Sequence, residues 1–117
     1  MEILLIDDNE DITTMMHKYL TIKGHGCTVS NDGRNGLTLI EQQKFDVVLL
    51  DLAMPEFTGI DVVESLYSSG KIKNKKIILF TASSVKDEEI KKLIKKGVHS
   101  CLKKPVKLEA LMKAIGG

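Results

Sequence analysis

The stretch Asp46-Val47-Val48-Leu49-Leu50-Asp51 places four consecutive apolar residues between two aspartates. A continuous apolar run, without alternation of polar residues, predicts a strand covered on both faces, as in a parallel sheet with helices on either side. Ile77-Ile78-Leu79-Phe80 repeats the pattern. With these two, five apolar and β-branched stretches are predicted as strands: Glu2–Ile6, Cys27–Ser30, Asp46–Leu50, Lys76–Phe80 and His99–Leu102.

Segments of helical period lie between and after the predicted strands. The clearest spans residues 12–20, with apolar residues three and four apart, and precedes Gly24, where a helix would end. Similar spacing predicts helices around 37–40, 60–66, 90–94 and 108–115. Five βα units predict an α/β fold: a doubly wound, five-stranded parallel sheet with five helices, in a three-layer sandwich. A chain of 117 residues suits one domain, expected to span residues 1–117.

The composition predicts a soluble, cytoplasmic protein. Hydrophobic residues make up 43% of the chain, and the formal net charge is +1. The apolar runs are far shorter than the roughly 20 residues that span a bilayer, and the first residues do not resemble a signal peptide. Cys27 and Cys101 lie far apart without zinc-like spacing, so both are expected to be reduced.

Charge is unevenly distributed along the chain. Residues 1–60 hold four Lys or Arg and ten Asp or Glu, whereas residues 61–117 hold thirteen Lys and six acids. We interpret most of these lysines as solvated helix faces, and a face that binds an acidic partner or forms a dimer is the weaker interpretation. Aromatic residues are only 4% of the chain, too few for a nucleic-acid stacking surface, so direct nucleic-acid binding is not expected.

Reactive side chains follow several of the predicted strands: Asp7-Asp8, Asp51, Thr81 and Lys103-Lys104-Pro105. Each alone has an ordinary structural explanation, such as a helix cap, a turn or a solvated charge. Parallel strands present their carboxyl ends at one edge of the sheet, so these groups are expected to converge. Crowded acids raise one another's pKa, and Mg²⁺ with a lysine ammonium would compensate their charge.

This set of groups suits phosphoryl transfer to a carboxylate, which needs a nucleophile, a metal ion and a cation near the phosphoryl oxygens. Asp51 is the best candidate nucleophile because it follows the most apolar strand. The turn over residues 52–55 ends at Pro55 and could offer a backbone carbonyl to the metal. Gly59 has no side chain, so the next predicted helix can begin close to this turn.

The same motifs, in this order, resemble the receiver domain of two-component response regulators, including the chemotaxis regulators. The resemblance covers nearly the whole chain and implies the flavodoxin-like strand order 2-1-3-4-5. It implies that Asp51 accepts a phosphoryl group from a sensor histidine kinase or a histidine phosphotransfer protein. It further implies a set of site residues: Asp8, Asp51 and the Ala53 carbonyl as Mg²⁺ ligands, Asp7 acting mainly through metal-bound water, and Thr81 and Lys104 as phosphoryl-binding groups.

Lys104 is preferred to Lys103 because the family's lysine directly precedes proline, through a bond that is usually cis in that family.

The chain departs from the family at Cys101, where many relatives carry an aromatic ring that rotates on activation. Ala53 and Ser83 are expected to flank the phosphoryl group and to set its lifetime. An unknown output partner is expected on the surface made by segments 90–94, 99–102 and 108–115.

Two other functions fit the same fold. A metal-dependent phosphohydrolase of the haloacid dehalogenase type also forms an aspartyl phosphate, but it places a second Asp two residues after the nucleophile, where this chain has Ala53. A flavodoxin-like cofactor binder needs phosphate-binding amides after its first strand, where Asp7-Asp8 would repel phosphate. The sequence therefore favours a signalling switch with slow self-dephosphorylation over an enzyme that turns over substrate.

Overall fold

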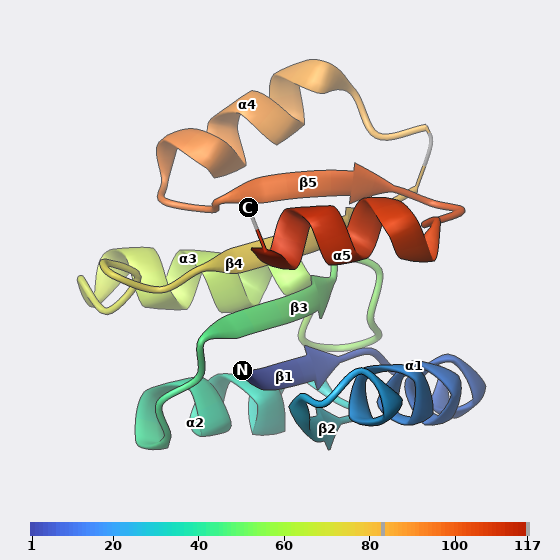
Figure 1. The fold of residues 1–117 in the computed structure, drawn as a ribbon. Helices are drawn as coiled ribbons and strands as arrows, with labels where there is room; N and C mark the ends of the chain where they lie inside the picture. Colours follow the sequence, from blue (N-terminus) through green and yellow to red (C-terminus); the bar gives the residue numbers. More distant parts are fainter. Residues whose placement is uncertain (83, 117) are drawn as a thin grey trace.

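The computed structural model describes residues 1–82 and 84–116 (Figure 1). Five strands lie within these ranges: β1 (Glu2–Ile6), β2 (Gly26–Ser30), β3 (Val47–Asp51), β4 (Ile77–Thr81) and β5 (Ser100–Lys103). The helices alternate with them: α1 (Glu10–Ile22), α2 (Gly33–Gln42), α3 (Gly59–Ser68), α4 (Asp87–Lys95) and α5 (Leu108–Gly116). None of these helices has the length and apolarity that crossing a membrane requires.

The strands form one parallel sheet in the order β2-β1-β3-β4-β5, which confirms the predicted topology. Strand boundaries differ from the predicted ones by one residue at several ends. The pairing of β3 and β4 continues as far as Asp51, which is in register with Phe80, and Thr81 is in register with Lys103. Asp51 and Thr81 are therefore the last residues of their strands, held by the sheet rather than by a loop.

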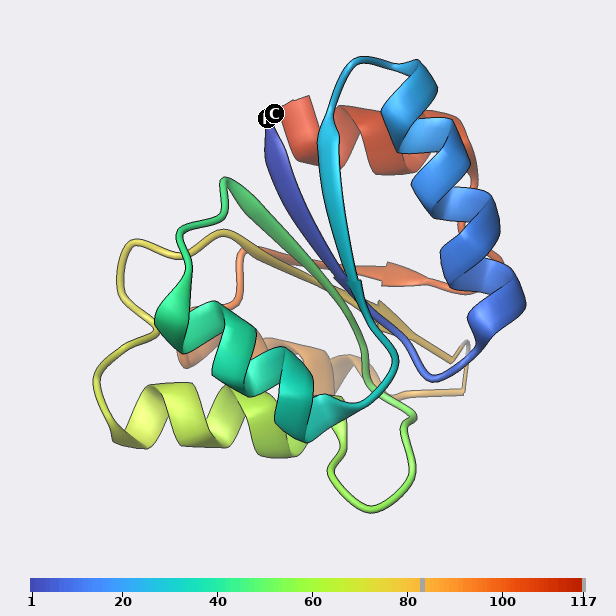
Figure 2. The ribbon, with the colours of Figure 1, turned by 90° about the horizontal axis from the view of Figure 1, so that it is seen from below.

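Helices cover both faces of the sheet, with α1 and α5 on one side and α2, α3 and α4 on the other (Figure 2). The residues of β3 and β4 are buried on both faces, as the continuous apolar runs predict. Leu50 belongs to the core beneath α2, α3 and α4, and Leu49 to the core beneath α1 and α5. Truncating such a residue to alanine lowers the free energy of unfolding by about 2 to 5 kcal/mol. The strand that ends at Asp51 is therefore fixed by packing on both of its faces.

Side chains other than the candidate site residues cap the helices nearest the site. The Asn9 side chain accepts hydrogen bonds from the backbone N–H groups of Asp11 and Ile12 at the start of α1. The Thr58 side chain caps α3 in a capping box with Asp61. Neither Asp7 nor Asp8 is the α1 cap, so their carboxylates remain available for another role.

Candidate functional site

Three carboxylates converge at the carboxyl edge of the sheet. Asp7 and Asp8 follow β1, and Asp51 ends β3 beside it. One oxygen from each of the three lies within 4.8 Å of the others. Asp7 and Asp51 are only 1% and 3% exposed, whereas Asp8 is exposed to solvent. The group is thus anchored in the core on one side and open to a ligand on the other.

The Asp7 carboxylate has one satisfied and one unsatisfied oxygen. Its Oδ1 accepts a hydrogen bond from the backbone N–H of Asn9 at 2.9 Å, while its buried Oδ2 has no partner within residues 1–82 and 84–116. Burial raises the pKa of Asp7, the Asn9 hydrogen bond lowers it, and the nearby Asp51 charge raises it further. A buried carboxylate oxygen without a partner, beside two other acids, fits a hard divalent cation such as Mg²⁺.

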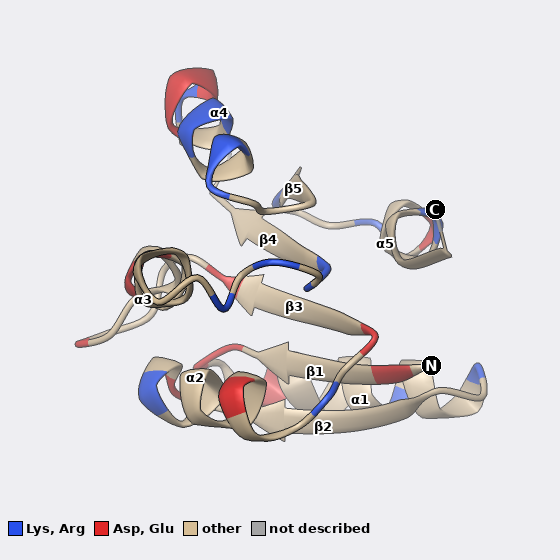
Figure 3. Cartoon of the chain, turned by 90° about the vertical axis from the view of Figure 1, so that its left-hand side faces the viewer, with Lys and Arg blue, Asp and Glu red and all other residues tan. Residues whose placement is uncertain are grey.

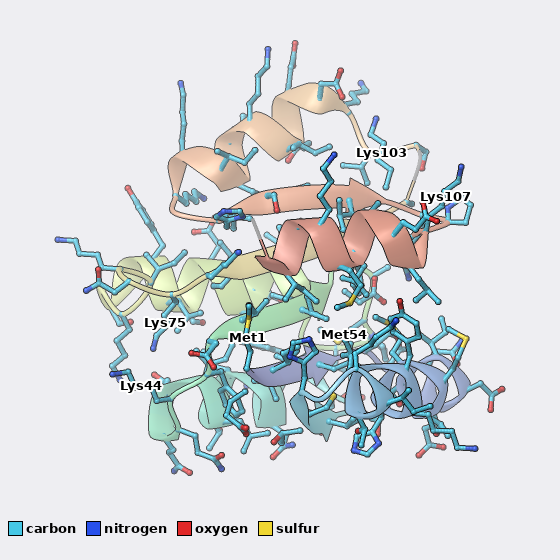
Figure 4. All side chains as sticks on the ribbon, in the orientation of Figure 1. Met1, Lys44, Met54, Lys75, Lys103 and Lys107 are labelled. Atoms are coloured by element: carbon cyan, nitrogen blue, oxygen red, sulfur yellow. The ribbon has the colours of Figure 1, made fainter. Side chains whose placement is uncertain are left out.

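Lys104 provides positive charge at the same point. Its Nζ lies 3.1 Å from Oδ1 of Asp51, and its backbone N–H donates to the carbonyl of Thr81 at 2.8 Å. The Lys104–Pro105 bond is cis. Lys103 turns elsewhere and pairs with Asp87 at 3.4 Å, on the surface toward α4, and Figure 4 shows Lys103 at the right-hand end of the sheet. Of the two adjacent lysines, Lys104 is the one that contacts Asp51.

Thr81, the last residue of β4, brings a hydroxyl to the same end of the sheet. Thr81 is fully buried, and its Oγ1 has no hydrogen-bond partner in the described part of the chain. Ala82 follows as a small, exposed residue. Ser83, which the family resemblance predicts to flank a phosphoryl group, lies outside the described residues. Leaving a buried hydroxyl without a partner is unfavourable, and a hydrogen bond from this hydroxyl to a bound anion would remove that cost.

The turn after β3 holds Asp51 close to α3. The Ala53 N–H approaches Oδ1 of Asp51 at 3.4 Å, and the N–H of Gly59 donates to the Leu52 carbonyl at 3.1 Å. A Cβ at Gly59 would lie 2.5 Å from the carbonyl oxygen of Asp51. Glycine therefore permits the start of α3 to pack directly against the end of β3, as its position in the sequence suggested.

Sequence reasoning missed two residues that hold the segment bearing Asp7. The side-chain amide of Asn31 donates to the Asp7 carbonyl at 2.8 Å and to Oγ1 of Thr13 at 3.1 Å. Thr13 lies in α1 and is 3% exposed. A polar residue directly after the second predicted strand was the available signal for Asn31. Thr13 gave a weaker one, because a threonine on the buried face of a helix needs a polar neighbour.

Cys101 lies in β5, in register with Leu79, and packs against the core beneath α2, α3 and α4. It is partly buried, and burial raises the pKa of its thiol. His99, two residues before Cys101, is exposed, and its ring contacts Oγ of Ser100 at 3.2 Å. The position therefore holds a small side chain facing the core.

Comparison with known proteins identifies the family. The model of the response regulator receiver domain matches residues 3–116. Response regulator MprA of Mycolicibacterium vanbaalenii is 31% identical over 112 residues, covering 96% of this chain and 47% of that protein. A cyclic di-GMP phosphodiesterase of Thermotoga maritima is 32% identical over 112 residues, covering 95% of this chain and 29% of that protein. The chain thus spans less than half the length of these relatives.

Solved structures of receiver domains share the fold. The Francisella response regulator 1452 receiver domain superposes with a TM-score of 0.88 at 26% identity, covering 98% of this chain and 93% of that one. Chemotaxis protein CheY4 of Vibrio cholerae superposes with a TM-score of 0.85 at 26% identity, covering 98% and 95%.

Fold and site together define a flavodoxin-like α/β signalling domain with an acidic carboxyl edge. The chain belongs to the response regulator receiver domain family, and it is a receiver domain of two-component signal transduction. Nothing in these comparisons favours the haloacid dehalogenase alternative.

Proposed function

We propose that Asp51 accepts a phosphoryl group from a phosphohistidine of a sensor histidine kinase or histidine phosphotransfer protein. The single observation that carries the proposal is the grouping at the end of β3. A nearly buried carboxylate lies within 4.8 Å of two other acids and 3.1 Å from the Lys104 ammonium. Solvated surface acids would not need such a counter-charge, whereas a phosphoryl acceptor does.

In this proposal Asp8, Asp51 and the Ala53 carbonyl would hold Mg²⁺ directly, and Asp7 would act mainly through water bound to the metal. The buried Oδ2 of Asp7, which has no hydrogen-bond partner in the part of the chain that the structure describes, supports the assignment. When bound, the cation neutralises the acids and the charge on the phosphoryl oxygens. Without it, three carboxylates face one lysine, and an incoming phosphate would be repelled.

The transfer step uses the chain's own residues as follows. A carboxylate oxygen of Asp51 attacks phosphorus, a P–O bond forms, and the P–N bond to the donor histidine breaks with its electron pair going to the imidazole nitrogen. The imidazole then takes a proton from solvent. Lys104 pairs with the phosphoryl oxygens, and the hydroxyl of Thr81 donates a hydrogen bond to them. Satisfying that buried hydroxyl favours a conformation in which the hydroxyl of Thr81 has moved toward the phosphoryl group, and this change is the proposed switch.

The proposed role is a signalling switch, not an enzyme with turnover. Ala53 stands where a phosphohydrolase would need an acid, so hydrolysis of the acyl phosphate is expected to be slow. Ala53 and Ser83 set its rate in this proposal. Replacing Ala53 with Asn and Ser83 with Glu is expected to change the dephosphorylation rate measured by loss of the phosphorylated mass. Unchanged rates in both variants would refute that role.

The proposal extends to the whole of residues 1–117 as one receiver domain, working in the cytoplasm without direct contact to nucleic acid. Its output partner would bind the face of α4, β5 and α5. Because Cys101 is too small to act as a rotating aromatic plug, the signal is expected to travel through displacement of the backbone and α4.

Intact-mass measurement after incubation with acetyl phosphate and Mg²⁺ tests the assignment of Asp51. One phosphate adduct is expected for the wild type, and none for Asp51→Ala or for the wild type with a chelator. Asp87→Asn is a matched control, because Asp87 is an exposed acid whose single ion-pair partner among the described residues is Lys103 at the surface. An adduct that persists in Asp51→Ala would defeat the proposal.

A further inference from the structure

Lysines gather at the amino edge of the sheet, the end opposite Asp51. Figure 3 turns this edge toward the viewer and shows basic residues along the loop before β4 and along α4. Figure 4 labels Lys44 and Lys75 at the same end. A groove of about 570 Å³ opens between the loop after α3 and the loop after α4. We call it the basic groove, lined chiefly by Tyr67, Ile72, Lys73, Lys75, Lys95 and Lys96.

The floor of the basic groove is preformed. The N–H of Ile72 donates to the Leu66 carbonyl at 3.1 Å, and the N–H of Gly97 donates to the Ile94 carbonyl at 3.0 Å, so each loop is tied back to its helix. Ile72 is 6% exposed, and a Cβ at Gly97 would lie 3.2 Å from its Cγ2. The two loops are therefore in contact beneath the lysines, and a ligand would not need to order them.

The charges of the basic groove are only partly compensated. Lys96 pairs with Glu64 and lies 5.7 Å from the centre of the Tyr67 ring. Lys73 and Lys95 are exposed and have no carboxylate partner among residues 1–82 and 84–116. No aspartate or glutamate lines the groove in the described part of the chain. Ammonium groups facing one cavity produce a positive potential that attracts an anion.

We propose that the basic groove binds an acidic segment of a partner protein. Its carboxylates would pair with Lys73 and Lys95 at the rim, and an apolar side chain would lie on Tyr67 and Ile72. Nucleic acid fits less well, because lysines alone would pair with its phosphates without the arginine forks and stacked aromatic rings that strengthen its recognition. The groove has one aromatic ring, and the chain's single arginine, Arg34, lies in α2.

Binding at this edge has a consequence for signalling. The groove lies at the amino ends of the strands, whereas the carboxylates and Lys104 lie at their carboxyl ends. A partner held by the groove therefore leaves Asp51 open to a phosphate donor. The groove would serve as a tether that does not compete with phosphorylation.

Fluorescence anisotropy with a short labelled peptide of glutamates around one central phenylalanine tests the proposal. The double variant Lys73→Glu/Lys95→Glu is expected to weaken binding about tenfold or more at moderate salt. The matched control Lys18→Glu/Lys113→Glu makes the same charge change on exposed residues of α1 and α5 and is expected to change affinity less than twofold. In amide NMR spectra of the wild type, the peptide is expected to shift Gly97 and Asn74 most.

Three outcomes would overturn the inference. Equal losses in the two double variants would mean that the peptide senses net charge alone. Shifts centred on another surface would place the site elsewhere. Inorganic tripolyphosphate that binds more tightly than the peptide, through Lys73 and Lys95, would make the groove a phosphate site. Both double variants are expected to accept phosphate from acetyl phosphate normally, so this test stands apart from that of Asp51.

Discussion

The two edges of the central sheet carry opposite charge in opposite environments. At the carboxyl edge, Asp7 and Asp51 are almost completely buried, and Oδ2 of Asp7 has no partner within the described residues. At the amino edge, Lys73 and Lys95 stand in solvent around a preformed groove. The same strands support both, so the difference arises from how far each charge has been removed from water.

That difference predicts how each edge responds to change. A charge in a low-dielectric setting interacts strongly with its neighbours, and a solvated charge is screened by water and salt. Substitutions at the carboxyl edge should therefore have large effects on stability and ligand affinity. Substitutions at the amino edge should leave folding almost unchanged and act through salt-sensitive binding.

The largest effect is expected from adding one methyl group at the carboxyl edge, which is compared with the same addition at the amino edge. Gly59→Ala places a Cβ 2.5 Å from the Asp51 carbonyl oxygen, which is rigid backbone, so it should lower the free energy of unfolding by about 3 kcal/mol. The matched control is Gly70→Ala at the amino edge, where φ is +73° and no atom lies within 4 Å. It should cost about 1 kcal/mol from backbone strain alone.

Urea denaturation of both glycine variants measures the comparison. If Gly70→Ala lowers the free energy of unfolding as much as Gly59→Ala does, then glycine at position 59 is not required by the close approach of α3 to the end of β3. If Gly59→Ala costs less than its control, α3 can move away from Asp51, and the carboxyl edge is less rigid than the contacts imply.

Asn31→Ala should have the next largest effect, because it removes two hydrogen bonds that hold the segment of Asp7 and α1. We expect a loss of about 2 kcal/mol, and a smaller rise in melting temperature when Mg²⁺ is added. Asn35→Ala is the control. Within the described residues its side-chain amide donates one hydrogen bond, to Oγ of Ser30 at 2.9 Å, so the substitution should lower the free energy of unfolding by about 1 kcal/mol and keep the full Mg²⁺ response. Thermal melts with Mg²⁺ and with chelator distinguish the two. If Mg²⁺ raises the melting temperature of both variants equally, Asn31 does not position Asp7 for metal binding.

Replacing Asp7 with Asn should stabilise the metal-free domain at neutral pH by about 1 kcal/mol, because a neutral amide replaces a buried carboxylate beside Asp51. Burial raises the pKa of Asp7 above 3.8, so the folded state retains the proton to higher pH than the unfolded state. Protonated Asp7 therefore contributes favourably to wild-type stability at low pH. This contribution is lost as the pH rises through the pKa of Asp7 in the folded state.

The gain from Asp7→Asn should accordingly shrink as the pH falls toward 3.8, and the stabilisation by Mg²⁺ should weaken at pH 7. Chemical denaturation in chelator at several pH values checks the sign. A variant that is less stable at every pH would show that the Asp7 carboxylate makes a net favourable contribution without metal.

The fold was predictable because its signals are local and repeated. Five apolar runs that alternate with segments of helical periodicity are compatible with few topologies. The order of the strands followed from the family resemblance. Boundaries were harder: Asp51 and Thr81 look like residues after a strand, yet their ladder partners extend the pairing. Helix propensity alone makes a glycine at position 36, within α2, about 1 kcal/mol less favourable than alanine, whereas in the fold a Cβ there would lie 2.6 Å from Cδ1 of Ile6.

The acidic group was predictable for the same topological reason, since parallel strands bring their ends together. The support around it was not. Asn31 reaches the Asp7 carbonyl only because β2 pairs with β1, a contact between residues far apart in sequence. The basic groove is similar: the lysine excess in the second half of the chain was visible, but Lys73 and Lys95 meet only in the folded protein.

The smallest effect is expected at the amino edge, from the ion pair between Lys71 and Glu41. The two groups lie 3.0 Å apart with side-chain exposures of 54% and 32%, so water and salt screen their attraction. A double-mutant cycle with Lys71→Met and Glu41→Gln should give a coupling below about 0.5 kcal/mol that disappears at high salt. A coupling above 1 kcal/mol that survives salt would mean that charges at this edge help to fold the domain. A small, screened coupling would mean instead that the amino-edge lysines can be exchanged at little cost to folding, which leaves their arrangement free to be set by binding.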